Sequence, residues 1–239
     1  MELKDLIIRG AYDYNIELDE HKVSQFMKYM LLLKEWNKKI NLTAITEDYD
    51  IVKKHFIDSL SIIKSNVIKK GSYIIDVGTG AGFPGIPIKI VIPEVKVVLL
   101  DSLNKRIKFL NTVIDELMLK DIVSIHGRAE EMSKSSLYRE AFDIATARAV
   151  ANMNLLSEYC LPYVKKGGYF IAMKGPSGYK EVVEASKAIT VLGGTIKEII
   201  ETKIVDEEIK HNIIVIEKTQ STPLKYPRQF AIIENNPIK

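Results

Sequence analysis

Three glycines at alternate positions, directly after an apolar run, are the residues best suited to bind a ligand. The run, positions 72–77, is rich in β-branched residues and contains an acid, Asp76, near its end, as is typical of a buried parallel strand. The glycines are Gly78, Gly80 and Gly82. Glycine lets the backbone turn sharply and approach a ligand where a Cβ would collide. Pro84 suits the first turn of a helix, so we predict a strand, a glycine turn and a helix start that cradle a nucleotide-like ligand.

The spacing of the glycines separates the nucleotide classes. A dinucleotide fingerprint, G-x-G-x-x-G, would need glycine at position 83, which is Phe83. The sequence contains no G-x-x-x-x-G-K-[ST], so we expect no P-loop. The stretch DVGTGAG at 76–82 instead resembles the first motif of class I S-adenosylmethionine-dependent methyltransferases. A glycine-rich turn without a ligand stays open as the alternative.

Further polar groups follow the later predicted strands. Asp101 ends the apolar run 96–101, and an acid there can accept hydrogen bonds from both ribose hydroxyls of a nucleoside lying across the strand ends. After the next strand, the backbone N–H of Ala129 and the carboxylate of Glu130 could hold an adenine edge. Arg148 leaves a fourth strand, where an unpaired guanidinium would be costly, so we expect it to hold the donor or a substrate base.

One helical turn brings together three residue types known from hydrolases: His55, Asp58 and Ser59. We reject a catalytic triad because Ser59 lacks a nucleophile elbow and triad members normally come from separate elements. His55 and Asp58 are therefore expected to form a hydrogen-bonded pair at a helix end or a wall of the substrate cleft.

A sheet must position these residues. The predicted strands are 72–77, 96–101, 121–126, 142–150, 167–174, 196–205 and 211–217. Helical patterns such as 104–119 separate most of them, which predicts parallel βαβ units with right-handed crossovers, whereas the last two strands form an antiparallel pair. We therefore predict an α/β fold with a doubly wound, mostly parallel seven-stranded sheet of the Rossmann-like class. Two prolines in 222–228 predict an extended surface loop.

The first part of the chain is helical in period. Its apolar residues share one stripe: Val23, Phe26, Met27, Met30 and Leu33. Because such a stripe needs a partner, we predict that residues 1–66 form an N-terminal helical extension packed on the core. Residues 67–239 then form the S-adenosylmethionine-binding domain.

The composition is that of a globular protein. Hydrophobic residues make up 46% of the 239 residues and charged residues 27%, and no run of about 18 apolar residues would span a membrane. The start lacks a signal-peptide pattern, and Cys160 is the only cysteine, so we expect a cytoplasmic protein without an internal disulfide. A net charge of +3 and an excess of Lys and Arg after position 210 suit a nucleic-acid partner or a plain solvated surface equally.

Seven motifs, in order along most of the chain, resemble the RsmG (GidB) family. They are NLTAIT (41–46), KHFIDSL (54–60), DVGTGAGFPGI (76–86), DSLNKRIKFL (101–110), GRAEE (127–131), ARAVA (147–151) and TPLKYPR (222–228). The resemblance implies methyl transfer from S-adenosylmethionine to N7 of a guanine in small-subunit (16S) ribosomal RNA. It also implies donor binding by Gly78, Phe83, Ala129, Glu130 and Arg148. Lys54 departs from the family, which more often has Arg there, and lysine lacks bidentate phosphate geometry.

The predicted site joins the family positions to the acids and glycines above. The donor-binding candidates are Asp76, Gly78, Gly80, Phe83, Asp101, Ala129, Glu130 and Arg148. The RNA-binding candidates are Lys54, His55, Arg106, Arg128, Lys174, Tyr226 and Arg228, each weighed evenly against a plain surface role. The expected partner is 16S ribosomal RNA, the small ribosomal subunit or an assembly particle. We expect a monomer, no membrane contact and no metal ion.

The residues fit N7 chemistry better than other base methylations. Guanine N7 carries a free lone pair, so the protein mainly has to align the reactants, and the sequence offers no convincing general base. Methylation of an exocyclic amine would call for [DNS]-P-P-[YF] where 147–150 reads ARAV, and C5 methylation needs a positioned thiolate, whereas Cys160 suits a core. Three alternatives stay open: a methyltransferase with the same donor site acting on another RNA, a protein or a small molecule; a nicotinamide dehydrogenase, disfavoured by Phe83; and a nucleotide-sensing module without turnover.

Overall fold

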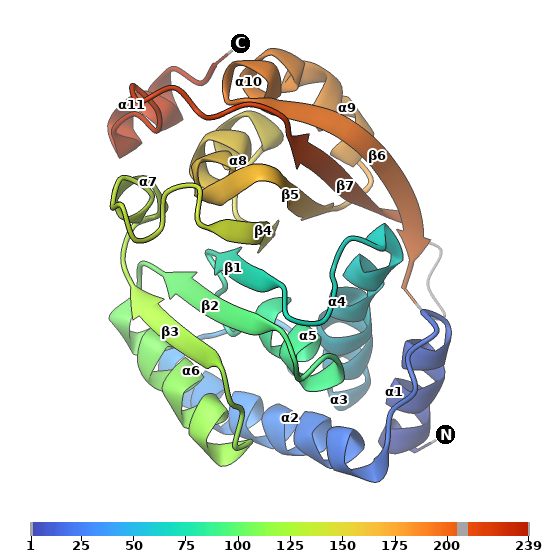
Figure 1. Cartoon of the computed structure of the whole chain (residues 1–239). Helices are drawn as coiled ribbons and strands as arrows, with labels where there is room; N and C mark the ends of the chain where they lie inside the picture. Colours follow the sequence, from blue (N-terminus) through green and yellow to red (C-terminus); the bar gives the residue numbers. More distant parts are fainter. Residues whose placement is uncertain (1, 205–209, 239) are drawn as a thin grey trace.

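A seven-stranded sheet runs through the middle of the molecule (Figure 1). The computed structural model describes residues 2–204 and 210–238. The strands are β1 Tyr73–Val77, β2 Lys96–Asp101, β3 Ile122–His126, β4 Phe142–Arg148, β5 Val164–Lys174, β6 Gly194–Lys203 and β7 Lys210–Lys218. Their order is β3-β2-β1-β4-β5-β7-β6, and β7 runs antiparallel to the other six strands of this described sheet. The predicted doubly wound, mostly parallel sheet is confirmed.

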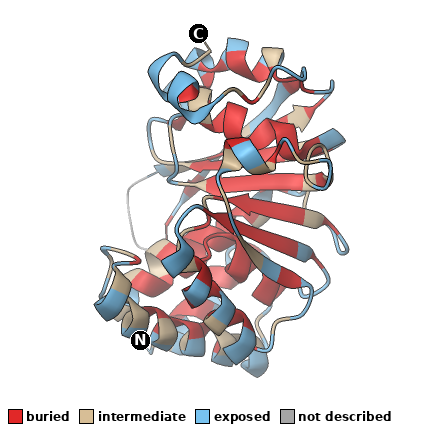
Figure 2. Cartoon of the chain, turned by 90° about the vertical axis from the view of Figure 1, so that its left-hand side faces the viewer, coloured by how far each residue is buried: buried red, intermediate tan, exposed pale blue. Residues whose placement is uncertain are grey.

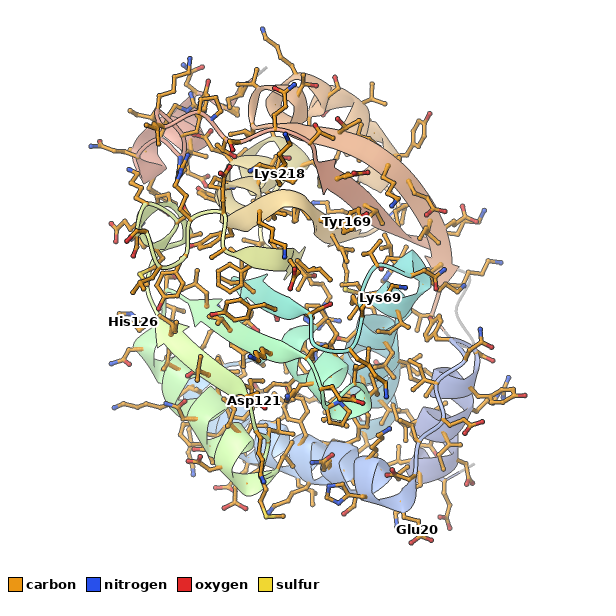
Figure 3. The ribbon with its side chains drawn as sticks, in the orientation of Figure 1. Glu20, Lys69, Asp121, His126, Tyr169 and Lys218 are labelled. Carbon is orange, nitrogen blue, oxygen red and sulfur yellow. The ribbon has the colours of Figure 1, made fainter. Side chains whose placement is uncertain are left out.

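The strand order reverses between β1 and β4, and the glycine turn directly follows β1. Ile75 of β1 lies opposite Val98 of β2 on one side and Ala145 of β4 on the other. Ligands of open α/β sheets bind outside the carboxyl ends of the strands at such a reversal. Figure 3 labels Asp121 just before β3 and His126 at its carboxyl end, so this edge of the sheet can be followed there.

Several predicted boundaries were wrong. β5 begins at Val164 and β6 at Gly194, earlier than predicted, because pairing with neighbouring strands extends both across glycine-containing stretches. β4 ends at Arg148, inside the range 142–150 predicted for the strand and its exit, since Ala149 adopts a left-handed φ of 55°. The helix predicted over 104–119 ends at Glu116, because Met118 is left-handed as well. The predicted end of the sixth strand, Val205, lies outside the described residues.

Helices cover both faces of the sheet (Figure 1). One face carries α1 Leu3–Tyr12, α2 Glu20–Ile40, α3 Asp48–Asp50, the π-helix η1 Ile51–Ile57, α4 Asp58–Leu60, the 3₁₀-helix η2 Ser61–Ser65, α5 Gly85–Val91 and α6 Asn104–Glu116. The other carries α7 Ala129–Met132, α8 Met153–Cys160, the 3₁₀-helix η3 Leu161–Tyr163, α9 Gly178–Glu184, α10 Ser186–Val191 and α11 Phe230–Asn235. Among residues 2–204 and 210–238, no helix combines the length and apolarity needed to cross a bilayer.

The central strands β1, β2 and β4 are buried on both faces, as Figure 2 shows by the red strands between the helices. In β1, Ile74 belongs to the cluster under the N-terminal helices and Ile75 to the cluster on the opposite face. Successive side chains of a strand point to opposite faces, which is why a strand covered twice needs the continuous apolar run seen in the sequence.

The N-terminal helices pack on the sheet through the predicted stripe. Asp19 caps α2 by accepting a hydrogen bond from the backbone N–H of Lys22 (2.8 Å), and the stripe residues Phe26 and Leu33 are fully buried. The Tyr29 hydroxyl donates to the Ala81 carbonyl in the glycine turn. The extension therefore helps to shape the turn, and its predicted boundary after residue 66 stays a prediction.

The segment 222–228 forms no helix or strand and exposes Leu224 and Lys225, as predicted for a surface loop. It is not simply extended, because it contains a turn at 223–226 and is tied to the fold by side-chain contacts. Arg139 donates to the carbonyl oxygens of Thr222 (2.7 Å) and Tyr226 (2.9 Å). Lys218, labelled in Figure 3 at the end of β7, is fully buried and donates to the Thr222 hydroxyl (2.5 Å). Prolines restrict the backbone of the segment, but Arg139 lies more than 80 positions away in the sequence, so no local pattern predicts its contacts.

Candidate active site

A buried carboxylate holds the glycine turn. Asp76, at 0% exposure, accepts hydrogen bonds at Oδ2 from the Thr79 hydroxyl (2.6 Å) and the backbone N–H of Gly85 (2.8 Å). Burial raises the pKa of Asp76 to about 6, although these two hydrogen bonds favour the charged form. Asp76 therefore ties the strand end to the start of α5. Pro84, predicted in the first helical turn, stands at the N-cap instead.

Two of the glycines have left-handed backbones, and one of them, Gly80, leaves room for a ligand. Gly78 has a φ of +68°, and a Cβ there would lie 2.8 Å from the Val150 side chain. Gly80 has a φ of +62°, and a Cβ there would meet no described atom within 4 Å. Its backbone N–H donates to Asp101 Oδ2 (2.9 Å). The turn thus requires glycine conformations and presents its backbone to open space.

A cavity of about 300 Å³, here called the glycine-loop cavity, opens at the ends of β1, β2 and β3. Its described lining residues are Val77, Gly78, Leu100, Asp101, Ser102, Gly127, Arg128, Ala129, Glu130, Val150, Ala151, Tyr159, Phe230 and Glu234. Four of the predicted donor-binding residues line it: Gly78, Asp101, Ala129 and Glu130. Asp76 and Gly80 support the turn beside it. Apolar side chains and carboxylates together suit a nucleoside that carries positive charge.

Asp101 and Glu130 are the buried acids of this cavity, at 2% and 4% exposure. Asp101 accepts hydrogen bonds from the backbone N–H groups of Gly80 and Leu103 (2.9 Å each) and from Arg106 (3.2 Å). A carboxylate has about four acceptor positions. A diol that takes two of them must therefore displace the Arg106 guanidinium, the longest of the three contacts.

Residues 148–151 separate the glycine-loop cavity from a second one. Arg148 and Ala149 line the second cavity, whereas Val150 and Ala151 line the glycine-loop cavity. The left-handed Ala149 makes this division possible by turning the chain at the end of β4. A non-glycine residue in this conformation is uncommon and is often found at functional sites. The Lys174 ammonium donates to the Ala151 carbonyl (2.8 Å) and fixes the segment.

The second cavity, here called the arginine cavity, has a volume of about 480 Å³. Its polar lining includes Lys54, His55, Asp58, Arg148, Lys174, Glu181 and His211. Arg148 donates to Asp58 Oδ2 (2.8 Å) and to the Lys54 carbonyl (2.9 Å), and its guanidinium carbon lies 4.9 Å above the Phe83 ring. These contacts fix the orientation of Arg148 at the strand end.

His55 is a neutral member of this cluster. Its ring stacks on Phe83 at 4.6 Å, and its Nδ1 lies 3.2 Å from Arg148 Nη2. Because a guanidinium only donates, Nδ1 must accept, so Nε2 carries the proton and donates to the Thr43 hydroxyl (2.8 Å). Burial, together with the Arg148 charge, lowers the pKa of His55 to about 3. His55 therefore positions Arg148 and Phe83 without adding charge.

Asp58 joins three elements in the arginine cavity. Besides Arg148, it accepts a hydrogen bond from His211 Nδ1 of β7 (2.9 Å). Burial alone would raise the pKa of Asp58, but hydrogen bonds from His211 and Arg148 outweigh it and lower the pKa. Ser59 donates to the His55 carbonyl (2.5 Å), so its hydroxyl is not paired with the imidazole as in a triad. His55 and Asp58 form a cavity wall, the second of the two predicted alternatives.

The neutral His55 predicts a pH-dependent stability. The unfolded chain binds a proton near the ordinary pKa of about 6.5, whereas the folded chain does so near 3. The contribution is present above pH 6.5 and is lost as the pH falls toward 3. We expect the wild-type protein to lose about 2 kcal/mol of unfolding free energy from this group between pH 7 and pH 5. Urea denaturation at both pH values measures this loss.

A His55→Gln variant should lack that loss, because glutamine does not titrate. His126→Gln, at an exposed position on β3, is the matched control and should keep it. Asp76 acts in the opposite direction. Because its pKa is raised in the folded protein, its contribution to the unfolding free energy increases as the pH falls from 6 to 4. The comparison is therefore made between variants. Equal pH dependence in wild type and His55→Gln would contradict the assignment.

The remaining predicted residues are distributed over both cavities and the C-terminal segment. Phe83 and Arg148, predicted to bind the donor, lie in the cluster beside the arginine cavity. Of the RNA candidates, Lys54, His55 and Lys174 line the arginine cavity and Arg128 the glycine-loop cavity, while Arg106 pairs with Asp101. RNA contact by these residues stays a prediction.

Arg228 is bound inside the protein. It donates through Nε (3.0 Å) and Nη2 (2.7 Å) to Glu158, which is 0% exposed, and through Nη1 to the Asn236 carbonyl (2.9 Å). Its backbone N–H binds Glu158 as well (2.8 Å). Tyr226 lies half-buried beside it. The structure thus gives Arg228 a structural role, which the basic motif around it did not reveal.

Among the residues of these cavities that the sequence interpretation missed are Tyr159, Glu181, His211, Phe230 and Glu234. Tyr159 and Glu234 share a hydrogen bond (2.7 Å) across 75 positions of the chain. Only a weak helical signal, Phe230 and Ile233 three positions apart, was present for α11. No local pattern shows which distant element such a short helix contacts.

The comparisons with known proteins agree with this arrangement. Residues 22–210 match the family model GidB, described as rRNA small subunit methyltransferase G. The Ribosomal RNA small subunit methyltransferase G of Clostridium tetani is 53% identical over 239 residues, which is 100% of both chains.

Solved structures show the same fold at low sequence identity. A SAM-dependent methyltransferase from Aquifex aeolicus has 20% identity and a TM-score of 0.50, with 66% of this chain and 89% of that chain covered. TYW2 of M. jannaschii, solved in complex with AdoMet, has 14% identity and a TM-score of 0.52, with 66% and 74% covered. The predicted Rossmann-like class is confirmed. The full-length match to the Clostridium protein and the family match over residues 22–210 show that this chain belongs to the GidB family, rRNA small subunit methyltransferase G.

Proposed function

We propose that this protein transfers the methyl group of S-adenosylmethionine to N7 of a guanine in the small-subunit (16S) ribosomal RNA. The observation that carries the proposal is the pair of cavities on either side of residues 148–151, at the reversal of strand order. One cavity holds the donor and the other receives the base. The family membership and the names of the relatives support a ribosomal RNA substrate.

The residues of the glycine-loop cavity fit the donor. The open space at Gly80 accommodates a ligand close to the backbone, and Asp101 offers an acceptor to a ribose diol when Arg106 moves away. Ala129 and Glu130 border the same cavity, where a backbone N–H and a carboxylate can meet an adenine edge. The carboxylates also favour the positive charge of a sulfonium.

The arginine cavity fits guanine. In guanine, O6 is an acceptor next to N7. Arg148 and Lys174, at 13% and 10% side-chain exposure, can donate to O6 and leave the N7 lone pair free for the methyl group. Asp58 and Glu181 provide carboxylates in the same lining, which can accept hydrogen bonds from N1–H and the exocyclic amine. Adenine carries its N6 amine in the place of O6. This amine is a hydrogen-bond donor, so it cannot accept a hydrogen bond from Arg148 or Lys174.

The chemistry needs alignment and no general base. S-adenosylmethionine supplies the methyl group, and guanine N7 uses its own lone pair to form the new bond as the carbon–sulfur bond breaks. The protein holds the two reactants in line about 3 Å apart. The Asp76 clamp fixes the glycine turn, and the cluster of Asp58, His55 and Phe83 fixes Arg148.

The substrate class sets the expected place of action and partner. A methyltransferase of 16S ribosomal RNA works in the cytoplasm, on RNA, on the small subunit or on an assembly particle, and we expect it to act as a monomer. The alternative is a methyltransferase with the same donor cavity that modifies another RNA, a protein or a small molecule.

Transfer of labelled methyl groups tests the proposal. Small subunits, deproteinised 16S ribosomal RNA, total protein and small metabolites are incubated separately with the enzyme and labelled donor. We expect label in the 16S RNA of at least one of the first two, and borohydride–aniline cleavage at a single guanine, which identifies N7-methylguanine. Label only in protein or metabolites, or label in RNA without cleavage, would contradict it.

A further inference from the structure

We propose that the C-terminal helix α11 completes the donor site, with Phe230 as an aromatic wall against the adenine of the donor. The inference rests on the proposed function, because it assigns residues to the same glycine-loop cavity. The family model matches residues 22–210, so α11 lies beyond the part that this model describes. In Figure 1, α11 lies beside α7 and α8.

Two residues of α11 face the glycine-loop cavity. Phe230 and Glu234 are four positions apart, hence on one side of the helix, and both line the cavity together with Ala129 and Glu130. Ile233, at 0% exposure, packs into the core and sets the rotation of the helix. Phe230 stays 46% exposed, so a large part of its ring is available to a ligand.

The helix is held in place by α8, which provides three anchors. Tyr159 donates to Glu234 (2.7 Å), Asn154 donates to the Ile238 carbonyl (3.1 Å), and Glu158 binds Arg228 just before the helix. These contacts hold the chain just before α11, near the end of α11 and after it. The helix is therefore in place before the ligand binds. Such preorganisation reduces the entropy lost on binding.

The surroundings of Phe230 suit the adenine half of the donor. Its ring lies under the Arg128 guanidinium (4.8 Å), and Arg128 lies 3.8 Å from Glu130, one of the two residues predicted at the adenine edge. Asp101, the predicted ribose ligand, lines the same cavity. A nucleobase stacks on aromatic rings regardless of its hydrogen-bonding edge. Phe230 can therefore contact the flat face of the adenine, whereas Ala129 and Glu130 can hydrogen-bond its edge.

Calorimetry with the full-length protein tests this role. S-adenosylhomocysteine is titrated into wild type, Phe230→Ala, Phe230→Trp and Ile232→Ala. We expect Phe230→Ala to weaken binding about tenfold, the lower part of the range for base–aromatic stacking, and Phe230→Trp to keep the affinity. Ile232 is 45% exposed on the same helix and is absent from the described cavity lining, so Ile232→Ala is the matched control and should bind like wild type.

The outcomes separate this inference from the proposed function. Binding by wild type with equal affinity in Phe230→Ala would overturn the role of the ring and leave the function standing, whereas no binding by wild type would overturn both. Equal weakening in Phe230→Ala and Ile232→Ala would show a general disturbance of α11 and also contradict the role. 5′-Methylthioadenosine, which lacks the amino-acid half, should lose the same factor in Phe230→Ala. An unchanged affinity for it would refute contact with adenine.

Discussion

Replacing Arg228 by alanine is expected to lower the free energy of unfolding by about 3–5 kcal/mol at pH 7. The change leaves Glu158 as a charge without its partner at 0% exposure, where it now receives two side-chain nitrogens and one backbone N–H of Arg228. A buried carboxylate that loses its cation keeps the cost of its desolvation without the ion pair that offsets it. Urea denaturation followed by circular dichroism measures the loss.

Two further variants sharpen the stability experiment. Arg228→Lys keeps the charge but loses the fork-shaped donor set, so we expect an intermediate loss. Lys225→Ala, an exposed neighbour in the same segment, should change the unfolding free energy by less than about 0.5 kcal/mol. If Arg228→Ala lost less than about 1 kcal/mol, the assignment of Arg228 to the fold would be wrong.

Replacing Arg148 by alanine is expected to reduce kcat/KM for methyl transfer by about 100-fold or more. Its guanidinium joins Asp58, the Lys54 carbonyl and the Phe83 ring, and misplacing a reacting group by about 1 Å costs roughly 100-fold in rate. Because Arg148 lines the arginine cavity, we expect the affinity for S-adenosylhomocysteine to fall by less than about threefold, an energy change below 1 kcal/mol. Kinetics with small subunits and calorimetry measure the two quantities.

This experiment decides between the two roles predicted for Arg148. Loss of S-adenosylhomocysteine binding in parallel with activity would make Arg148 a donor ligand and contradict its placement on the base side. Arg148→Lys retains a charge but reaches fewer of the three partners, so its rate should lie between those of wild type and Arg148→Ala. Thermal unfolding of each variant shows whether the fold is intact, since Asp58 keeps His211 as a partner.

The fold could be predicted because its signals are local. The apolar run of β1 predicts a buried strand, and the three glycines after it predict a tight turn. The acid at the end of β2 predicts a hydrogen-bond acceptor. Each of these signals lies within a short stretch of sequence. The spacing of the apolar residues in α2 likewise predicts which face of the helix is buried. Residue types and spacing, together with the family resemblance, assigned Gly78, Asp101, Ala129 and Glu130 to one ligand site, and all four line the glycine-loop cavity.

The rest of the site depends on contacts between distant parts of the chain. Asp58 and His211 are 153 positions apart, and Arg228 and Glu158 are 70 apart. A basic residue that binds RNA and one that neutralises a buried acid look the same in sequence, so sequence alone places Arg228 among the RNA candidates. Arg148 and Val150 line different cavities because Ala149 between them is left-handed. Alanine rarely adopts this conformation, so the sequence does not predict it.

A crystal structure of this protein with S-adenosylhomocysteine tests the account most directly. We predict the adenosine in the glycine-loop cavity, its ribose hydroxyls at Asp101, its adenine between Glu130 and Phe230, and its sulfur facing residues 148–150 toward the arginine cavity. A ligand bound within the arginine cavity, or a glycine-loop cavity that remains empty at saturating ligand, would contradict it.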